Sequence, residues 1–165
     1  MYGPYQKVGA LMAVVVTLTD SQMAVAVKEA ERRMESGRNQ TSRTFTGITL
    51  TQELKQQIDV LGAVSEMAVS LYLRLPWTGR GGIGASDVDG YEVRSSQRKE
   101  GKDYYLYIRE YDKDAVYIYC VVDGPKVVIA GWATAADVRT KGRLLYEDNQ
   151  CYGLPRQELY PMEAL

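Results

Sequence analysis

The first part of the chain shows apolar residues at helical spacing between polar ones. Thr19 and Gln22 have the spacing of a capping box, and Gly37 follows the last periodic apolar residue, Met34. These signals predict a helix between Thr19 and Gly37. The polar segment that follows lacks periodicity, so we expect a loop there.

A second helical pattern begins at Thr51, a candidate N-cap, and ends before Pro76. Its periodic apolar positions, which we expect to form one buried face, are Leu54, Ile58, Leu61, Ala68 and Tyr72. Glu66 lies on the flank of this face, one turn after Gly62. We expect Gly62 to allow close approach of a neighbouring element and Glu66 to lie near the sheet.

From residue 91 onward the pattern changes to short runs that favour strands, separated by turn signals. The runs are YEVRSS, YYLYIREY, AVYIYCVVD and KVVIAGW. Thr134 and Asp137 then predict a short capped helix, and the tail from Tyr152 to Leu165 is expected to be irregular. The order of elements predicts a mixed α/β (α+β) fold, with helices flanking one central mixed sheet of four to five strands.

Composition narrows the possible functions. With 165 residues, 45% hydrophobic, the chain is expected to form a single domain over 1–165, and its net charge of −1 argues against coating nucleic acid by bulk charge. The absence of histidine removes the commonest metal ligand and general base. Cys120 and Cys151 lack CxxC spacing and are interpreted as buried free thiols. Any metal must therefore bind carboxylate oxygens, which favours Mg²⁺ or Mn²⁺.

The longest apolar run near the start of the chain, GALMAVVV, is too short to cross a bilayer and lacks a signal-peptide pattern. We expect a soluble, cytoplasmic protein with no membrane partner, in which residues 1–11 are either a disordered leader before Met12 or the result of a misassigned start site. The glycine-rich segment WTGRGGIGAS matches no phosphate-binding motif, so no nucleotide cofactor is expected.

The stretch DVDGYEVRSS, residues 87–96, places three acids around a tight-turn signal. Asp-Gly at positions 89 and 90 predicts a hairpin in which Asp87 stands opposite Glu92 on one face, followed by Arg94 and Ser96. Opposed carboxylates destabilise a sheet unless a cation lies between them. A divalent metal or Arg94 could supply that charge, whereas an exposed hairpin could leave the acids simply solvated.

Basic residues follow the acids along the chain. Arg94, Arg98, Lys99 and Lys102 form a local cluster, and Arg80 lies in the preceding loop. Carboxylates beside basic groups suit metal-assisted phosphodiester hydrolysis, in which acids hold the ion and basic groups hold phosphate. A solvated strand end would show the same cluster.

Several segments together resemble the PD-(D/E)XK nuclease superfamily, whose members share the restriction-endonuclease-like fold. GAVSEMAVSLYL followed by DVDGYEVRSS is similar to the helical acid, aspartate hairpin and (D/E)-x-K strand of that superfamily. VVIAGWATAADV and YGLPRQELYPMEAL are similar to downstream segments of phage-type members. The resemblance covers residues 55–165 and implies a Mg²⁺- or Mn²⁺-dependent deoxyribonuclease, such as a phage replication or recombination nuclease or a junction resolvase.

The resemblance also implies residue roles. Glu66 would support the metal shell, Asp87 and Glu92 would ligate the ion, and Val93 would add its backbone carbonyl. Arg94 stands where the superfamily usually has lysine. Since arginine is not deprotonated in proteins, Arg94 could orient water or hold phosphate but could not act as a base. Ser86 replaces the proline that often precedes the aspartate, and Asp89 is a fallback for Asp87.

DNA would be the partner, contacted by Arg80, Ser96, Arg98, Lys99 and Lys102, and a homodimer would suit the cutting of a duplex or a junction. Two other functions stay open. The first is a nuclease-like fold kept only to bind DNA or a protein, which Arg94 favours. The second is an interaction protein, suggested by six tyrosines between residues 104 and 119. Tyrosines alternating on a half-buried sheet would explain them equally well.

Overall fold

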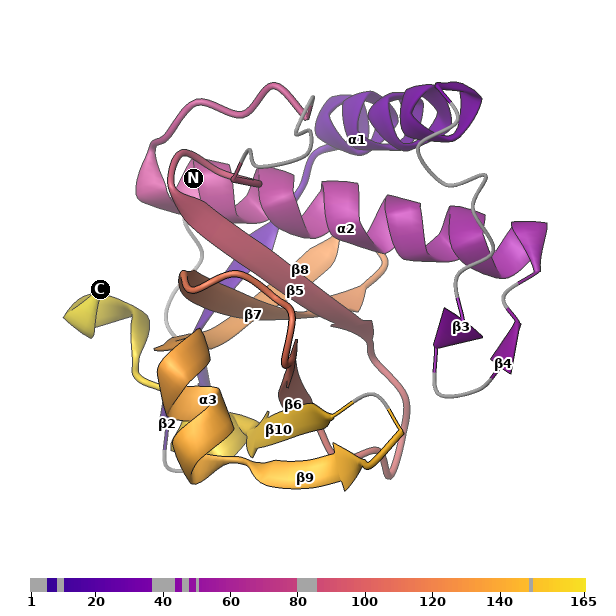
Figure 1. Ribbon diagram of the computed structural model, residues 1–165. Coiled ribbons are helices and arrows are strands. Elements are labelled where there is room, and N and C mark those ends of the chain that lie inside the picture. The colour runs from indigo at the N-terminus through magenta and orange to yellow at the C-terminus, as the bar shows by residue number, and fades with distance from the viewer. Residues whose placement is uncertain are drawn as a thin grey trace.

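A computed structural model describes residues 6–8, 11–36, 44–45, 48–49, 51–79, 86–148 and 150–165. One long helix, α2, covers one side of a central sheet, the other long helix, α1, packs on α2, and a smaller sheet with a short helix lies on the other side of the central sheet (Figure 1). The mixed α/β fold with flanking helices is therefore confirmed.

The central sheet has five strands in the order β1-β2-β8-β7-β5. They are β1 (Gln6–Val8), β2 (Leu11–Thr17), β8 (Lys126–Thr134), β7 (Val116–Asp123) and β5 (Tyr91–Gln97). Neighbouring strands run antiparallel except β5 and β7, which are parallel, so the sheet is mixed as predicted. Strand β5 is the last strand on one side of this sheet. One edge of β5 pairs with β7, and the opposite edge is its outer edge.

The sequence did not indicate β1 or β2, because the apolar run of β2 lacks the alternation of a half-exposed strand. Val14 and Val16 are buried, and Val15 is half-buried. The expected leader over residues 1–11 includes the paired strand β1, while residues 1–5 and 9–10 lie outside the described part of the chain.

A second sheet has the order β6-β10-β9, with β6 (Tyr105–Arg109), β10 (Cys151–Pro155) and β9 (Arg143–Tyr146). The expectation of one sheet was wrong in this respect, since the YYLYIREY run pairs with β10 rather than with the central sheet. The tail is also more regular than expected. It contains β10 and two 3₁₀ turns, Arg156–Glu158 and Met162–Ala164, and Trp132 pairs with Tyr160.

The capping residues predicted from the sequence are confirmed. Helix α1 (Asp20–Glu35) and helix α3 (Ala135–Lys141) begin with capping boxes at Thr19 and Thr134, and Thr51 caps α2 (Gln52–Leu73). The short strands β3 (Thr44–Phe45) and β4 (Ile48–Thr49) form a hairpin where a loop was expected.

The expected buried face of α2 is wrong at its start. Leu54 and Ile58 are 40% and 41% exposed, because the first turns of α2 extend beyond the central sheet (Figure 1). The buried part of α2 runs from Ala63 to Ser70 and includes Glu66.

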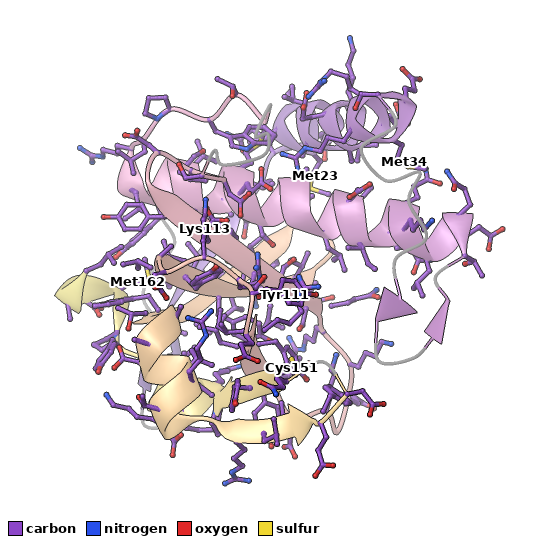
Figure 2. The ribbon with its side chains drawn as sticks, in the orientation of Figure 1. Met23, Met34, Tyr111, Lys113, Cys151 and Met162 are labelled. Carbon is purple, nitrogen blue, oxygen red and sulfur yellow. The ribbon has the colours of Figure 1, made fainter. Side chains whose placement is uncertain are left out.

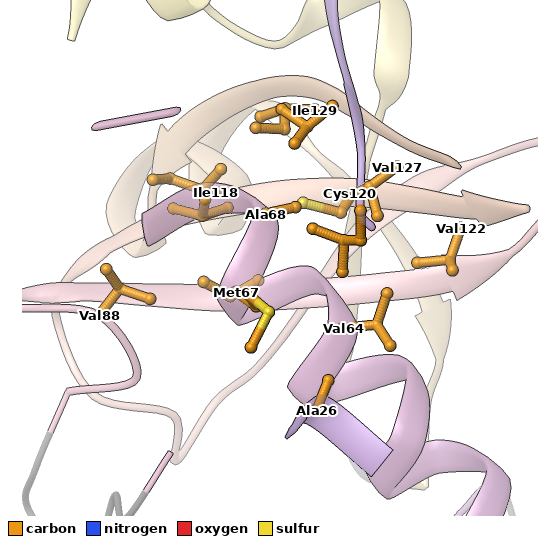
Figure 3. Close-up of a cluster of buried hydrophobic side chains, with 14 of the residues drawn as sticks. Ala26, Val64, Met67, Ala68, Val88, Ile118, Cys120, Val122, Val127 and Ile129 are labelled. Carbon is orange, nitrogen blue, oxygen red and sulfur yellow. The ribbon is translucent and has the colours of Figure 1, made fainter. Parts of the chain in front are cut away.

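The main core fills the space between α2 and the central sheet, where Val64, Met67 and Ala68 meet Ile118, Cys120 and Ile129 (Figure 3). A second core lies between the central sheet, the smaller sheet and α3, and includes Leu106, Tyr117 and Tyr119. Cys120 and Cys151 are buried free thiols, as predicted, and burial raises the pKa of Cys120 well above its usual range.

The tyrosine-rich strands mostly pack within the fold. Tyr117 and Tyr119 are fully buried, Tyr104, Tyr105 and Tyr107 are half-buried, and Tyr111 is exposed. No helix in the described residues combines the length and apolar character needed to span a bilayer.

Candidate functional site

The predicted Asp-Gly turn forms at the start of β5. Val88 and Tyr91 exchange backbone hydrogen bonds of 3.0 and 2.8 Å, so they pair as expected. Asp89 and Gly90, the two residues between them, have φ values of 31° and 96°. Positive φ at both central residues suits the right-handed twist of a hairpin, which explains the choice of Asp-Gly. The turn folds Asp87 back beside β5.

Asp87 is held against the outer edge of β5 by one hydrogen bond. Its Oδ2 accepts the backbone N–H of Val93 at 2.9 Å. In a strand, the N–H and C=O of one residue face the same edge. The Val93 carbonyl therefore faces the edge where the Asp87 carboxylate lies, which places these two candidate donors together.

Glu92 is the neighbouring acid and is 7% exposed. Lys113, from the loop between β6 and β7, forms an ion pair with it, with Nζ 2.5 Å from Oε1. This oxygen is buried, so the Lys113 ammonium is its close cationic partner. Burial raises the pKa of Glu92, the charge of Asp87 raises it further, and Lys113 and Arg94 act in the opposite direction.

The two faces of β5 are confirmed as predicted. Tyr91 and Val93 pack in the core against α2. Arg94 lies over the ring of Tyr117 at 4.9 Å, and Ser96 Oγ accepts a 2.7 Å hydrogen bond from Tyr119, so Glu92, Arg94 and Ser96 share the face of the second core. Alternation along the strand thus separates Glu92 from α2.

Arg94 is already engaged by a different acid. Its Nη2 lies 3.5 Å from Asp112 Oδ2, while its guanidinium stacks on Tyr117. Its side chain remains 30% exposed. Arg94 can therefore meet an anion from solvent, but it is not a direct hydrogen-bond partner of Glu92.

Glu66 lies in α2 and forms a buried ion pair that the sequence did not reveal. Arg33 of α1 donates to both carboxylate oxygens at 3.0 and 2.6 Å, and Trp77 Nε1 donates at 2.8 Å. Arg33 also donates to the carbonyl of Gly79 at 2.9 Å. Both oxygens of Glu66 are thus committed, and the network ties the two long helices to the segment that leads toward Asp87.

The expected close approach at Gly62 is wrong. Among the described residues, a Cβ added there would meet only Glu66 Oε1, at 4.0 Å, so no described neighbouring element requires a glycine at this position.

The negative charge of Asp87 raises the pKa of both Glu66 and Glu92. The three acids nevertheless do not converge on one point. In the part of the chain that the structure describes, no group of three Asp, Glu, Cys or His residues is placed to hold a metal ion. The donors at the β5 edge are Asp87, Glu92 and the Val93 carbonyl, a set of oxygens that suits Mg²⁺ or Mn²⁺.

The basic cluster lies farther from the acids than the sequence suggested. Arg98, Lys99 and Lys102 follow the far end of β5, and at 3.3 Å per residue six residues place Arg98 about 20 Å from Glu92. Arg98 pairs with the exposed Asp123 at 3.4 Å. Arg80 lies outside the described residues.

Lys113 is the cation that pairs with Glu92, and the sequence did not reveal this contact. Figure 2 shows Lys113 over the first part of β5, in agreement with its ion pair to Glu92. The sequence shows only a turn signal, YDKD, around it. No local pattern could have indicated that this loop returns to β5.

No family model matches this chain, and no curated protein or solved structure is significantly similar to it. The proposal below therefore rests on the residues and on their placement.

Proposed function

We propose that this protein is a metal-dependent nuclease that hydrolyses DNA phosphodiester bonds at the outer edge of β5. The observation that carries the proposal is the hydrogen bond from Val93 N–H to Asp87, which brings a carboxylate and a backbone carbonyl to one edge beside the buried Glu92. The side chains that would hold Mg²⁺ or Mn²⁺ are Asp87 and Glu92, with the carbonyl of Val93. A bound ion would lower the pKa of a water and neutralise charge on the phosphate.

The protein supplies a fixed, charged edge for this chemistry. Val93 orients Asp87, and burial makes the Glu92 carboxylate costly to leave without a cation. Arg94 keeps its charge at any ordinary pH and can hold a phosphate oxygen, but it cannot remove a proton from water. Glu66 fixes the arrangement of the helices through Arg33; its role as a metal ligand stays a prediction.

DNA contacts can continue along β5 beyond the acids. The length of the strand, about 20 Å, corresponds to roughly six base pairs at 3.4 Å each. Lys99 and Lys102 would then hold phosphates several nucleotides from the bond that is cut, and Ser96 lies between the two ends of the surface. A homodimer would place two such edges on one duplex or junction, and the cytoplasm of a bacterial host would be the location if a phage encodes the protein.

The test is cleavage of supercoiled plasmid and of a branched junction in Mg²⁺ and, separately, in Mn²⁺. Glu92→Gln keeps the shape of the side chain and removes its charge, and we expect it to lower the cleavage rate on the order of 100-fold. Glu158→Gln, an exposed acid in the tail, is the matched control and should cut like wild type. Cleavage that survives EDTA or Glu92→Gln would contradict the proposal.

One observation favours a second function, a nuclease-like fold that binds DNA or a protein without cutting. Lys113 pairs with Glu92 at 2.5 Å, so a cation of the protein itself already contacts this acid. This alternative predicts DNA binding that EDTA leaves unchanged, with no cleavage of either substrate.

A further inference from the structure

The ammonium group of Lys113 lies where a cation would approach Glu92. Its Nζ is 2.5 Å from Oε1, a buried carboxylate oxygen. The Lys113 side chain is 42% exposed, whereas the Glu92 side chain is 9% exposed. A buried acid whose cationic partner comes from a surface loop can exchange that partner without unfolding the core.

The loop that presents Lys113 is fixed by a second side chain. Arg139 of α3 pairs with Asp114 at 2.7 Å and donates to three backbone carbonyls of the loop, those of Arg109, Glu110 and Asp112. Asp112 closes the loop further, because its Oδ2 accepts the N–H of Arg109 at 2.9 Å. The backbone around Lys113 is thus held in place by these contacts.

We propose that Lys113 occupies the cation position of Glu92 and competes with a divalent metal ion for that carboxylate. This inference rests on the proposed metal edge of β5, and it adds a residue that sets how tightly the edge binds its ion. A divalent ion binds carboxylate oxygen at about 2.1 Å. Two cations at such distances from one oxygen repel each other strongly, so the ion and the ammonium cannot both remain in contact with Oε1.

The charge of Lys113 decides whether its loss strengthens or weakens metal binding. Removal of Lys113 takes away a competitor for the Glu92 carboxylate. It also takes away a positive charge that repels the metal ion. Arg94 pairs with Asp112 at 3.5 Å and stacks on Tyr117, and its charge acts on Glu92 whether or not Lys113 is present. Loss of Lys113 should therefore strengthen metal binding, whereas loss of a residue that helps to hold the metal would weaken it.

The experiment is calorimetric titration of Mn²⁺ into wild type, Lys113→Met, Lys113→Arg and Lys126→Met. We expect Lys113→Met to bind Mn²⁺ at least five-fold more tightly and Lys113→Arg to stay near wild type, since arginine keeps the positive charge. Lys126→Met makes the same change in net charge at the opposite end of β7 and β8, where Lys126 pairs with Asp123, and should not alter the affinity. Lys113→Gln replaces Lys113→Met if the latter is poorly folded.

Thermal unfolding gives an independent measurement. An ion that binds only the folded state stabilises it by an amount that grows with the logarithm of its concentration relative to Kd, so tighter binding raises the melting temperature more. Mn²⁺ should therefore raise the melting temperature of Lys113→Met more than that of wild type. Equal or weaker Mn²⁺ binding by Lys113→Met, or no binding by any variant, would overturn the inference. Tighter binding by Lys113→Met in a protein that cuts no DNA would support it and overturn only the nuclease proposal.

Discussion

Arg33 and Glu66 form the most deeply buried ion pair among the described residues, with side chains 8% and 7% exposed. Burial raises the pKa of Glu66, and the hydrogen bonds from Arg33 and Trp77 act against this rise. Because the folded-state pKa lies above the ordinary value, the contribution of Glu66 to stability is complete at low pH and is lost as pH rises through the folded pKa.

Replacement of Arg33 should increase the stability that is lost as Glu66 becomes charged. In Arg33→Met the pKa of Glu66 rises further, so the variant should be destabilised by about 3–5 kcal/mol at neutral pH and by less below about pH 4.5, where Glu66 is protonated. Urea unfolding at a series of pH values measures this. The double variant Arg33→Met/Glu66→Met should recover much of the loss, because it buries no unpaired charge. A pH-independent cost, or a double variant with the summed cost, would be inconsistent with a buried ion pair.

The residues of the candidate site differ in how far sequence could predict them. The Asp-Gly turn forms as expected, with Val88 paired to Tyr91, so the two faces of β5 could be predicted from local chemistry. Asp87 was expected to stand opposite Glu92, whereas its carboxylate lies at the strand edge, where it accepts the Val93 N–H at 2.9 Å. Arg33 and Lys113 could not be predicted, because each reaches its acid across a separation of 33 or 21 positions along the chain. Such contacts depend on how helices and loops pack, and no periodicity encodes that packing.

The elements themselves followed from caps and turns wherever the signal is local. Thr19, Thr51 and Thr134 all cap helices as expected. The sequence did not show which strands belong to which sheet, because YYLYIREY has the same alternation whichever strand it pairs with. The buried face of α2 failed at Leu54 and Ile58 for a similar reason, since helical spacing does not say where the covering sheet ends.

Helix α2 carries an unneeded glycine at its half-buried position 62. Within the described part of the chain, an added methyl group would meet only Glu66 Oε1 at 4.0 Å, an ordinary contact. Gly62→Ala should therefore stabilise the protein by about 0.5–1 kcal/mol, because alanine loses less backbone entropy in a helix. The midpoint of urea unfolding should move to higher urea.

Gly131 of β8 provides the opposite case and serves as the comparison. Its φ is 144°, and an added Cβ would lie 2.5 Å from the carbonyl oxygen of Tyr160. Gly131→Ala should destabilise the protein by about 1–3 kcal/mol, since the docked tail must shift or the backbone must strain. If both alanine variants moved the midpoint in one direction, the packing described for β8 or α2 would be incorrect.

At the scale of the whole molecule, the acids and the basic cluster lie at opposite ends of β5. The net charge of −1 means that DNA affinity must come from this local surface rather than from the overall field. Each phosphate contact contributes about −0.9 to the slope of log affinity against log salt concentration.

Replacement of both Lys99 and Lys102 by methionine should therefore make that slope shallower by about 2, and Mn²⁺ affinity should stay unchanged because the lysines are remote from Asp87. Fluorescence anisotropy with labelled duplex at several salt concentrations measures the slope. An unchanged slope would exclude these lysines from the DNA surface.

The most direct measurement is the anomalous diffraction of a crystal soaked in Mn²⁺. We expect a peak at the outer edge of β5, with oxygens of Asp87, Glu92 and the Val93 carbonyl at roughly 2.1 Å, the distance of Mg²⁺–oxygen bonds. The ammonium of Lys113 should then have left Glu92 Oε1. A crystal at saturating Mn²⁺ with no peak at this edge, and Lys113 still paired with Glu92, would contradict the metal site and the nuclease function built on it.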